Sequence, residues 1–356
     1  MAAPKFTVTT AEFDGKSTID RLKAIVTGEV SRYGNANDKF ALLDFPNHPN
    51  VGDSAIWLGE LAYFQSVYRA RPAFVSTMQN WNPDALRRAV PSGTIFLSGG
   101  GNFGDLWPEQ QVFRELVLKQ FPDRLIVQLP QSIHFESADN HRRAALAINA
   151  HEHFVLFVRD RRSFDLATAA YNCRVHLAPD MAFWIGVRSR GAAAKHRLLL
   201  LLRTDKESNQ VLSNGPAQIP GSIALDWLNE DPALYKKQKR RSVAMSPFAL
   251  KMGLFDKAKQ REFLFRNLAE RRLKRGLEIL SSASFVITDR LHCHILCVLL
   301  GIPHIVFDNS YQKLGNFIDA WTKECGLVRV AASVEEALEL WTTLQSDRDV
   351  RHDAFE

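Results

Sequence analysis

The chain has 356 residues, of which 46% are hydrophobic and 24% are charged, as in an ordinary globular protein. This length predicts two domains, and the absence of any run of 18 apolar residues argues against a transmembrane helix. The formal net charge of +6 is modest and scattered. We find no zinc finger, no recognition helix and no basic groove with interleaved aromatic residues, so we expect no nucleic-acid partner.

The N-terminus and the cysteines bear on the compartment. The first residues, MAAPKFTVTTAEFDG, lack the basic and then apolar pattern of a secretory signal. The four cysteines have no spacing that is typical of a disulfide framework. Both observations predict a cytoplasmic protein.

Short apolar strands alternate with helical segments through the first half of the chain. A first helix is predicted over 17–29, and the helix that begins at Ser54 has apolar residues at helical spacing. Strands are predicted at 40–45, 73–76, 94–97, 125–129, 154–158 and 175–177. This alternation is typical of a doubly wound parallel sheet, so we assign residues 1–190 to an N-terminal α/β domain.

The second half repeats the alternation after a small, polar linker at 188–196. Strands are predicted at 198–202, 223–228, 285–288 and 304–307, and a long basic helix is predicted over 257–280. We assign residues 197–332 to a second α/β domain and residues 333–356 to a C-terminal helix.

The stretch 284–313 contains the strongest candidate site. It reads as a strand, a helix and a second strand, and ligands of parallel sheets bind beyond the carboxyl ends of the strands. Arg290 and His292 lie at that point, where cations beside a helix N-terminus form an anion site. Two further polar residues follow the next strand, Asn309 and Lys313. The alternative is that Arg290 pairs with Asp289 and that His292 only begins the helix.

Polar residues follow the other predicted strands as well. Arg203 comes directly after the leucine run at 198–202, so it leaves the sheet at its carboxyl edge, either toward a ligand or in a salt bridge between domains. In the N-terminal domain the corresponding residues are Asn50, Gly52 and Asp53, then Gly100, Asn102 and Asp105, then Ser132 and His134. The alternatives are local, with Gly52 in a turn, Asp53 as a helix N-cap and His134 as a turn cap.

Familiar cofactor and metal motifs are missing. The run Gly99–Gly101 lets a ligand approach the backbone, but it is not the G-x-G-x-x-G fingerprint of dinucleotide sites and lacks the acidic residue about 20 positions later. The histidines and cysteines at 292–297 resemble zinc ligands, yet no second pair with C-x-x-C spacing exists. Small cysteines in an apolar helix fit a core better, so we expect neither a metal nor a cofactor.

Seven segments together resemble the polysaccharide pyruvyl transferase family. They are NVGDSAI, FLSGGGNFGDLW, QSIHF, RDRRS, PDMAF, Arg203 and TDRLHCHILCVLLGIPHIVFDNSYQK, in this order from about Asn50 to Lys313. The resemblance implies two Rossmann-like domains that face each other across a cleft, as in GT-B glycosyltransferases, with a C-terminal helix that crosses back to the first domain. It implies transfer of the enolpyruvyl carbons of phosphoenolpyruvate onto a sugar of a bacterial-type polysaccharide or its lipid-linked precursor. The products are a cyclic ketal and phosphate.

The resemblance also suggests roles for the residues. It assigns the donor site to Arg203, Arg290, Leu291 and His292, with Ser132, His134, Asn309 and Lys313 beside them. We expect His292 to be the general acid that protonates the donor methylene, because imidazole titrates near the working pH, and Arg290 to stabilise the departing phosphate. The acceptor side would then contain Asn50, Gly52, Asp53, Gly100, Asn102 and Asp105, and either Asp53 or Asp105 would accept a hydroxyl proton.

One dense basic patch, Lys236–Arg241, belongs to none of these motifs. It either faces an anionic membrane that carries a lipid-linked glycan, which would place the protein at the inner face of that membrane, or forms a solvated face, the interpretation that we favour. Two other functions compete. A GT-B glycosyltransferase that uses a nucleotide sugar needs a carboxylate for the ribose and a stacking residue, for which Asp308 and Tyr311 are candidates. A non-catalytic binding protein can also use this fold.

Overall fold

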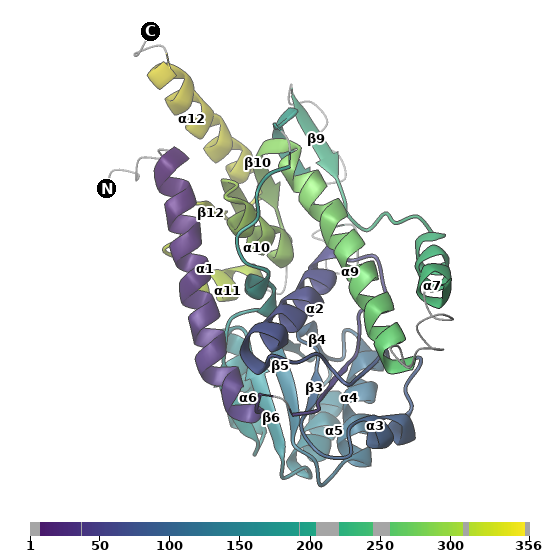
Figure 1. Ribbon diagram of the computed structural model, residues 1–356. Coiled ribbons are helices and arrows are strands. Elements are labelled where there is room, and N and C mark those ends of the chain that lie inside the picture. The colour runs from purple at the N-terminus through teal and green to yellow at the C-terminus, as the bar shows by residue number, and fades with distance from the viewer. Residues whose placement is uncertain are drawn as a thin grey trace. The chain divides into compact units, whose positions relative to one another are not determined.

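The structure is a computed structural model that describes residues 8–36, 38–191, 193–203, 221–244, 257–308 and 313–352 (Figure 1). It is a mixed α/β protein with two parallel sheets, which is the class that the alternation of strands and helices predicts. The chain divides into two compact units. We call residues 20–186 and 228–275 the N-sheet unit, and residues 1–19, 187–227 and 276–356 the C-sheet unit.

Seven strands form the sheet of the N-sheet unit. They are β1 (Ala41–Leu43), β2 (Phe74–Ser76), β3 (Ile95–Leu97), β4 (Gly100–Gly104), β5 (Ile126–His134), β6 (Phe154–Val158) and β7 (Arg174–Leu177). Their order is β2-β1-β3-β5-β6-β7, with β4 paired to β5 outside this path. The order reverses at β1, which has β2 on one side and β3 on the other. Such a switch point opens a crevice at the carboxyl ends of the strands, and ligands of parallel sheets bind there.

Helices cover both faces of this sheet. The helices are α1 (Val8–Val30), η1 (Ser31–Tyr33), α2 (Val51–Tyr63), η2 (Phe64–Tyr68), α3 (Pro83–Ala89), α4 (Pro108–Gln120), α5 (Ala138–Asn149), α6 (Arg161–Ala170), η3 (Met181–Ile185), α7 (Leu234–Ala244) and α9 (Lys257–Ser281). Successive residues of a strand point to opposite faces. Leu97 of β3 packs in one core cluster with Leu86 of α3 and Phe113 of α4. Phe96 packs on the other face against Phe64 of η2, with ring centroids 4.7 Å apart.

The glycine-rich segment after β3 is itself a strand, which the sequence pattern did not predict. β4 pairs with β5, and β5 therefore continues past its predicted end at residue 129 as far as His134. Gly104 lies opposite His134 with φ +129, and a Cβ added there would lie 1.7 Å from the His134 carbonyl oxygen, so the pairing requires glycine. Contrary to the prediction, Ser132 and His134 thus lie on a strand and not beyond its end.

The two units differ from the predicted domains in two long stretches and at the boundary, where residues 187–190 fall in the C-sheet unit. Residues 228–275 group with the N-sheet unit because α9 packs there, where Phe265 stacks on Phe45 with ring centroids 4.2 Å apart. Residues 1–19 group with the C-sheet unit. In this part of α1, a Cβ added at Gly15 would lie 3.0 Å from Leu327, so glycine permits close packing. The first helix also begins at Val8, earlier than the predicted residue 17.

Five strands form the sheet of the C-sheet unit. They are β8 (His196–Leu201), β9 (Ser222–Leu225), β10 (Ala283–Thr288), β11 (His304–Phe307) and β12 (Val328–Ala331), in the order β12-β11-β10-β8-β9. This order reverses at β8, which has β9 on one side and β10 on the other. The carboxyl ends of β8 and β10 therefore form a second switch point.

Among the described residues, three further helices belong to the C-sheet unit, beside the start of α1 and the end of α9. They are α10 (Leu291–Leu300), α11 (Lys313–Trp321) and α12 (Val334–His352). α10 is buried along most of its length and ends at Gly301, whose φ of +64 favours glycine. Ala337 and Trp341 of α12 join a core cluster with Ile305 of β11, and the predicted crossing of this helix to the first domain stays a prediction. None of the helices in the described ranges is long and apolar enough to span a membrane.

Candidate functional site

Two arginines come together at the switch point of the C-sheet unit. Leu201 pairs with Thr288 at the carboxyl ends of β8 and β10, and the Thr288 hydroxyl donates to the Leu201 carbonyl oxygen at 2.6 Å. The Arg203 amide donates to the Asp289 carboxylate at 2.9 Å. Arg203 and Arg290 therefore follow adjacent strand ends.

The Arg290 side chain pairs with Asp226, which follows β9. Nη2 of Arg290 donates to the two carboxylate oxygens of Asp226 at 2.7 and 2.8 Å, and the guanidinium lies 5.8 Å from the ring centre of Trp227. Arg290 is only 3% exposed. A buried guanidinium that is fixed by a carboxylate and an aromatic ring keeps its charge and its direction, which suits it to an anionic ligand.

Asp226 and Trp227 escaped the sequence analysis, although a signal was present. Asp226 follows the predicted strand at 223–228 much as Arg203 follows the leucine run, and both strands carry their polar residues to the same edge of the sheet. The predicted strand was too long by three residues at its carboxyl end, which hid Asp226 inside it.

The N-terminus of α10 lies at the same edge. Arg290 is the N-cap of α10, Leu291 and His292 belong to its first turn, and His292 is half-buried. The N–H groups of a first helical turn lack intrahelical partners and attract anions. Burial raises the pKa of Asp289 to about 6, against the hydrogen bond from Arg203 and the positive charges of Arg290 and Arg203. The negative charge of Asp289 therefore weakens as the pH falls toward that value.

Asp308 follows β11, the neighbour of β10, and caps the next helix. Its carboxylate oxygens accept from the Leu314 and Gly315 amides at 3.1 and 2.8 Å, at the start of α11. A carboxylate engaged in this way serves the helix and is poorly placed to hold a ribose. Lys313 begins α11, whereas its side chain, Asn309 and Tyr311 lie outside the described residues.

The zinc-like residues of α10 have other partners. Cys293 and Cys297 are buried and free of disulfides. Nδ1 of His294 lies 2.7 Å from Nε2 of His304, and its Nε2 lies 2.9 Å from the Thr322 hydroxyl. Across the described ranges, no group of three or more histidine, cysteine or acidic side chains could hold a metal ion.

The switch point of the N-sheet unit gathers most of the residues predicted on the acceptor side. Asn50 caps α2 by accepting from the Gly52 amide at 3.0 Å. Asp53 lies in the first turn, with Oδ2 3.6 Å from Nε2 of His48. A Cβ added at Gly100 would lie 3.8 Å from Oδ1 of Asp53, so the glycine-rich segment reaches the same place.

A buried carboxyl group holds the turn between β3 and β4. Oε1 of Glu60 accepts from the Gly99 amide at 2.7 Å, and Oε2 accepts from the Ser98 hydroxyl at 2.9 Å. Glu60 has no exposed surface, and burial raises its pKa to about 8 despite these hydrogen bonds. A carboxyl group on α2 therefore fixes the backbone just before Gly100.

Asn102 is fixed by a buried polar network. Its Oδ1 accepts from Nη2 of Arg114 at 3.0 Å and from Nε2 of Gln131 at 2.9 Å. Arg114 also donates to Gln128 at 2.7 Å and to Gln111 at 2.6 Å, and burial lowers its pKa to about 10. Because both partners of the Asn102 oxygen are donors, the orientation of the Asn102 amide is defined.

Asp105 is engaged elsewhere. Its carboxylate accepts from two backbone amides before α5, each at 2.8 Å, and from the Asn140 side chain at 3.2 Å. Burial raises the pKa of Asp105, but these hydrogen bonds outweigh burial and hold that pKa below its usual value. Asp105 thus stabilises the turn into α5, and its predicted part in acceptor binding stays a prediction.

Ser132 and His134 lie at the β5 end of the site. The Ser132 hydroxyl accepts from Nε of Arg159 at 3.0 Å, and Arg159 also pairs with Asp180 at 2.5 Å. A Cβ added at Gly101 would lie 3.0 Å from Nη2 of Arg159. His134 is mostly buried, with Nε2 3.8 Å from the Glu136 carboxylate. Ser132 therefore supports an arginine that packs on the glycine-rich strand.

Comparison with known proteins gives this arrangement a family. The polysaccharide pyruvyl transferase family matches residues 50–311. The chain is 31% identical over 348 residues to Pyruvyl transferase 1 of Schizosaccharomyces pombe, across 91% of this chain and 80% of that protein. It is 30% identical over 316 residues to EpsO of Bacillus subtilis, whose name also refers to pyruvyl transfer, across 86% of this chain and 92% of that protein. The chain belongs to the polysaccharide pyruvyl transferase family.

A solved structure supports the fold alone. A functionally uncharacterised protein from Klebsiella pneumoniae aligns with 88% of this chain and 99% of its own, with a TM-score of 0.57 and 17% identity. The matched range of the polysaccharide pyruvyl transferase family includes Asn50 and Asp53 near the first switch point and Arg203 and Arg290 near the second. The protein is therefore a transferase whose family match includes strands of both sheets.

Helix α9 of this pyruvyl transferase clamps the loop between β1 and α2. Arg272 donates through Nε and Nη2 to the Glu230 carboxylate at 2.8 and 2.9 Å, and through Nη1 to the Pro46 carbonyl oxygen at 3.2 Å. Arg275 donates to Glu230 at 3.2 Å and to the Pro49 carbonyl oxygen at 2.6 Å. Part of the basic character of this helix therefore serves to hold the loop that carries His48.

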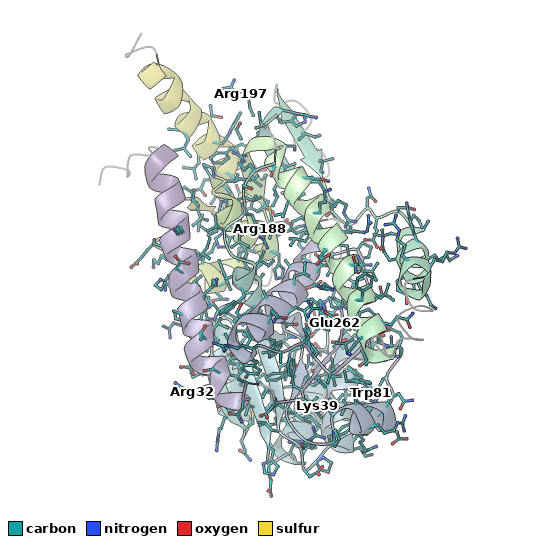
Figure 2. All side chains as sticks on the ribbon, viewed as in Figure 1. Arg32, Lys39, Trp81, Arg188, Arg197 and Glu262 are labelled. Carbon is teal, nitrogen blue, oxygen red and sulfur yellow. The ribbon has the colours of Figure 1, made fainter. Side chains whose placement is uncertain are left out.

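Other charges of α9 pack locally. Arg261 donates to the Val75 carbonyl oxygen at 3.3 Å, and the mostly buried Glu262, labelled in Figure 2, lies 3.5 Å from Arg266. The basic patch Lys236–Arg241 lies in α7, and its five cationic side chains are exposed. Such exposure suits a solvated face and a membrane-facing one equally, so the choice between them stays a prediction.

Proposed function

We propose that this pyruvyl transferase takes the enolpyruvyl group from phosphoenolpyruvate and joins it to two hydroxyls of a sugar in a polysaccharide or in its lipid-linked precursor. The products are a cyclic pyruvate ketal and phosphate. The observation that carries the proposal is the convergence of Arg203, Arg290 and the N-terminus of α10 at one switch point, in a chain of this family.

The chemistry of the donor supports this choice. Phosphoenolpyruvate carries a phosphate and a carboxylate, so its site needs more than one positive group. Arg203 and Arg290 follow adjacent strands, and the helix N-terminus adds N–H donors at the same edge. His292, in the first turn of α10, is the proposed general acid for the donor methylene, and Lys313 and Asn309 are proposed to contact the donor from the end of β11.

The N-sheet unit is proposed to bind the acceptor. Sugar hydroxyls are recognised by planar polar side chains and carboxylates, and Asn50, Asp53 and Asn102 offer both near a glycine segment that lets a ring approach the backbone. In this proposal the two units work together in the GT-B manner, as the resemblance implies. The protein would act in the cytoplasm, with peripheral contact to the inner face of a membrane where the acceptor is lipid-linked.

The donor is tested by the melting temperature of the purified protein in the presence of phosphoenolpyruvate, inorganic phosphate, UDP-glucose and GDP-mannose. A ligand at about 100 times its Kd adds about 2.7 kcal/mol to the free energy of unfolding. We expect phosphoenolpyruvate to raise the melting temperature most. We expect Arg290→Ala and Arg203→Ala to weaken the binding of phosphoenolpyruvate roughly tenfold or more, because each removes a hydrogen bond to a charged group.

Arg197→Ala is the matched control. Arg197 is exposed near the amino end of β8, the strand whose carboxyl end leads to Arg203 (Figure 2). Its replacement should leave the effect of phosphoenolpyruvate unchanged. Stabilisation by a nucleotide sugar alone would contradict the proposal and would favour a glycosyltransferase.

A further inference from the structure

We propose that Asp44, a residue that no motif of the sequence singled out, is the group that accepts the proton of the attacking sugar hydroxyl. Asp44 directly follows β1 at the switch point of the N-sheet unit, and the residue is half-buried. The inference rests on the proposed pyruvyl transfer and adds to it a proton acceptor different from Asp53 and Asp105.

The backbone of Asp44 is in an unusual conformation. Its φ is +67, one of two positive values at non-glycine residues in the described chain. The left-handed region costs free energy for residues with a Cβ, although aspartate and asparagine tolerate it best. The loop just beyond Asp44 is held by the Arg272 and Arg275 contacts to the Pro46 and Pro49 carbonyl oxygens. A tied loop therefore keeps Asp44 in this conformation.

The side chain of Asp44 lies among the residues gathered at this switch point. Its carboxylate lies close to the Asn102 side chain and within reach of the charges of Arg114, His48 and Asp53. Because the Asn102 oxygen already accepts from Arg114 and Gln131, the NH2 group is the part of Asn102 that can donate to a carboxylate. A carboxylate has two oxygens with several lone pairs, so a donor on one side leaves lone pairs that a sugar hydroxyl can use. A neighbouring amide and a backbone held by a tied loop suit a general base.

Burial and the charges around Asp44 shift its pKa. Burial raises its pKa to about 6, and the negative charge of Asp53 acts in the same direction. Arg114 of α4, His48 of the loop and the Asn102 side chain act against this shift. Asp44 is thus ionised at neutral pH and is a stronger base than an exposed aspartate, which is the condition that proton abstraction near neutral pH requires.

The proton balance of the reaction needs such a group. The first sugar oxygen forms a bond to C2 of the enolpyruvyl group while its proton passes to Asp44 and C3 takes up a proton from the general acid. The second hydroxyl then displaces the phosphate by bonding to C2, as the C2–O bond to phosphorus breaks. Two hydroxyl protons are released in total, of which one is balanced by the new methyl group and the other leaves with the phosphate. In the second step Asp44 gives its proton to the departing phosphate, and the proton of the second hydroxyl restores the general acid, so no other reactant is needed.

The inference is tested by the pH dependence of kcat/KM for phosphate release from phosphoenolpyruvate, with methyl hexopyranosides that offer a 4,6-diol as acceptors. In the wild-type protein we expect kcat/KM to fall as the pH decreases below about 6, which gives the profile an acidic limb. Asp44→Asn should lower kcat/KM by about 100-fold or more and abolish this limb, because a positioned base contributes that much. Asparagine tolerates the left-handed backbone, so this variant keeps the loop conformation.

Several variants make the result decisive. Asp44→Gly accepts the same φ without a carboxylate and should behave as Asp44→Asn does, which covers the case that asparagine fails to fold. Asp84→Asn removes an exposed carboxylate of α3 and should change nothing. Both Asp44 variants should keep the rise in melting temperature with phosphoenolpyruvate, because Arg203, Arg290 and His292, on which the proposed donor site mainly depends, lie in the other unit.

The opposing results are equally clear. An active Asp44→Asn protein that keeps the acidic limb, with a lower melting temperature, would overturn the inference and make Asp44 only a counter-ion of Arg114. Loss of the limb in Asp53→Asn, but not in Asp44→Asn, would assign the proton to Asp53. A wild-type protein that binds phosphoenolpyruvate and releases no phosphate with any of the acceptors would overturn the proposed function itself.

Discussion

Glu60 shows how one buried side chain couples the candidate site to pH. It accepts hydrogen bonds from Ser98 and Gly99 in the turn before Gly100, and it has no exposed surface. Its pKa of about 8 means that it is protonated in the folded protein at pH values where the unfolded chain has already lost the proton. An acid whose pKa is raised by folding stabilises the native state less as the pH increases.

We therefore expect the free energy of unfolding to fall as the pH rises from about 4.5 toward 8, the window between the unfolded and folded pKa values of Glu60. Glu60→Gln imitates the protonated form, since its amide can donate to Ser98 and its oxygen can accept from Gly99. In this variant the free energy of unfolding, measured by urea unfolding at a series of pH values, should fall less steeply as the pH rises. An equally steep decline in Glu60→Gln would show that other groups cause it.

Single residues also show what the sequence could not predict. The strand-end positions of Arg203 and Arg290 follow from the periodic apolar runs before them, and the structure pairs the two strands that they follow. The Asp226 partner of Arg290 is 64 positions away in the chain, and no local pattern encodes such a pair. Asp44 was hidden for a different reason, because its left-handed backbone depends on a loop that residues of α9 hold.

At the scale of elements, α9 and the loop between β1 and α2 behave as one assembly. Arg272 is 2% exposed on its side chain and is paired with Glu230 through two hydrogen bonds, whereas the side chain of Arg275 is 23% exposed. Removing one member of a buried ion pair leaves an uncompensated buried charge. This lowers the free energy of unfolding more than removing a partly exposed member of a pair does. The long basic helix, which belonged to no motif, thus gains a structural role.

Arg272→Ala should lower the free energy of unfolding by about 3–5 kcal/mol, and Arg275→Ala by about 1 kcal/mol. Both should also raise the KM for the acceptor, because the loop that leads to Asp53 is loosened. Chemical denaturation and steady-state kinetics measure the two effects. Arg142→Ala, which removes an exposed pair with Asp139 on α5, should change stability by less than about 1 kcal/mol. Equal losses for Arg272→Ala and Arg142→Ala would contradict the clamp.

The contact between α10 and β11 predicts an opposite dependence on pH. His294 and His304 are buried against each other and against Thr322, and burial lowers the pKa of both, that of His304 to about 4. The unfolded chain takes up these protons below about pH 6.5 while the folded chain does not, so stability is lost as the pH falls from 6.5 toward 4.

Replacing His294 with glutamine should make this acidic decline less steep, as seen in unfolding free energies between pH 4 and pH 7. Thr322→Val removes one hydrogen bond and leaves both imidazoles. It should lower stability by about 1 kcal/mol without changing the slope. A decline that is as steep in His294→Gln as in the wild type would mean that other groups take up the protons.

At the same scale, β4 is an element that the sequence pattern could not predict. Glycines are depleted in strands, so the segment 99–104 reads as a loop. It is nevertheless a strand in part because Gly104 permits a backbone approach to His134 that any side chain would block. The alternation of the long apolar strands was predictable, whereas a pairing made by glycine was not.

At the scale of the whole molecule, each sheet reverses its strand order next to the residues that the sequence singled out. In one unit the reversal lies at β1, near Asp53 and Gly100, and in the other it lies at β8, near Arg203 and Arg290. The α/β class and the strand ends follow from apolar periodicity. The assignment of residues 1–19 and 228–275 to units does not, since it depends on packing between segments far apart in the chain.

The measurement that tests the account most directly is phosphorus NMR of phosphoenolpyruvate incubated with the protein and the methyl hexopyranosides, followed by mass spectrometry of the sugars. We expect inorganic phosphate to appear only when protein and sugar are both present, and one sugar to gain the mass of pyruvate less one water. Phosphoenolpyruvate that stays intact, while a nucleotide sugar in the same mixture is consumed and the acceptor gains a hexose, would contradict the account.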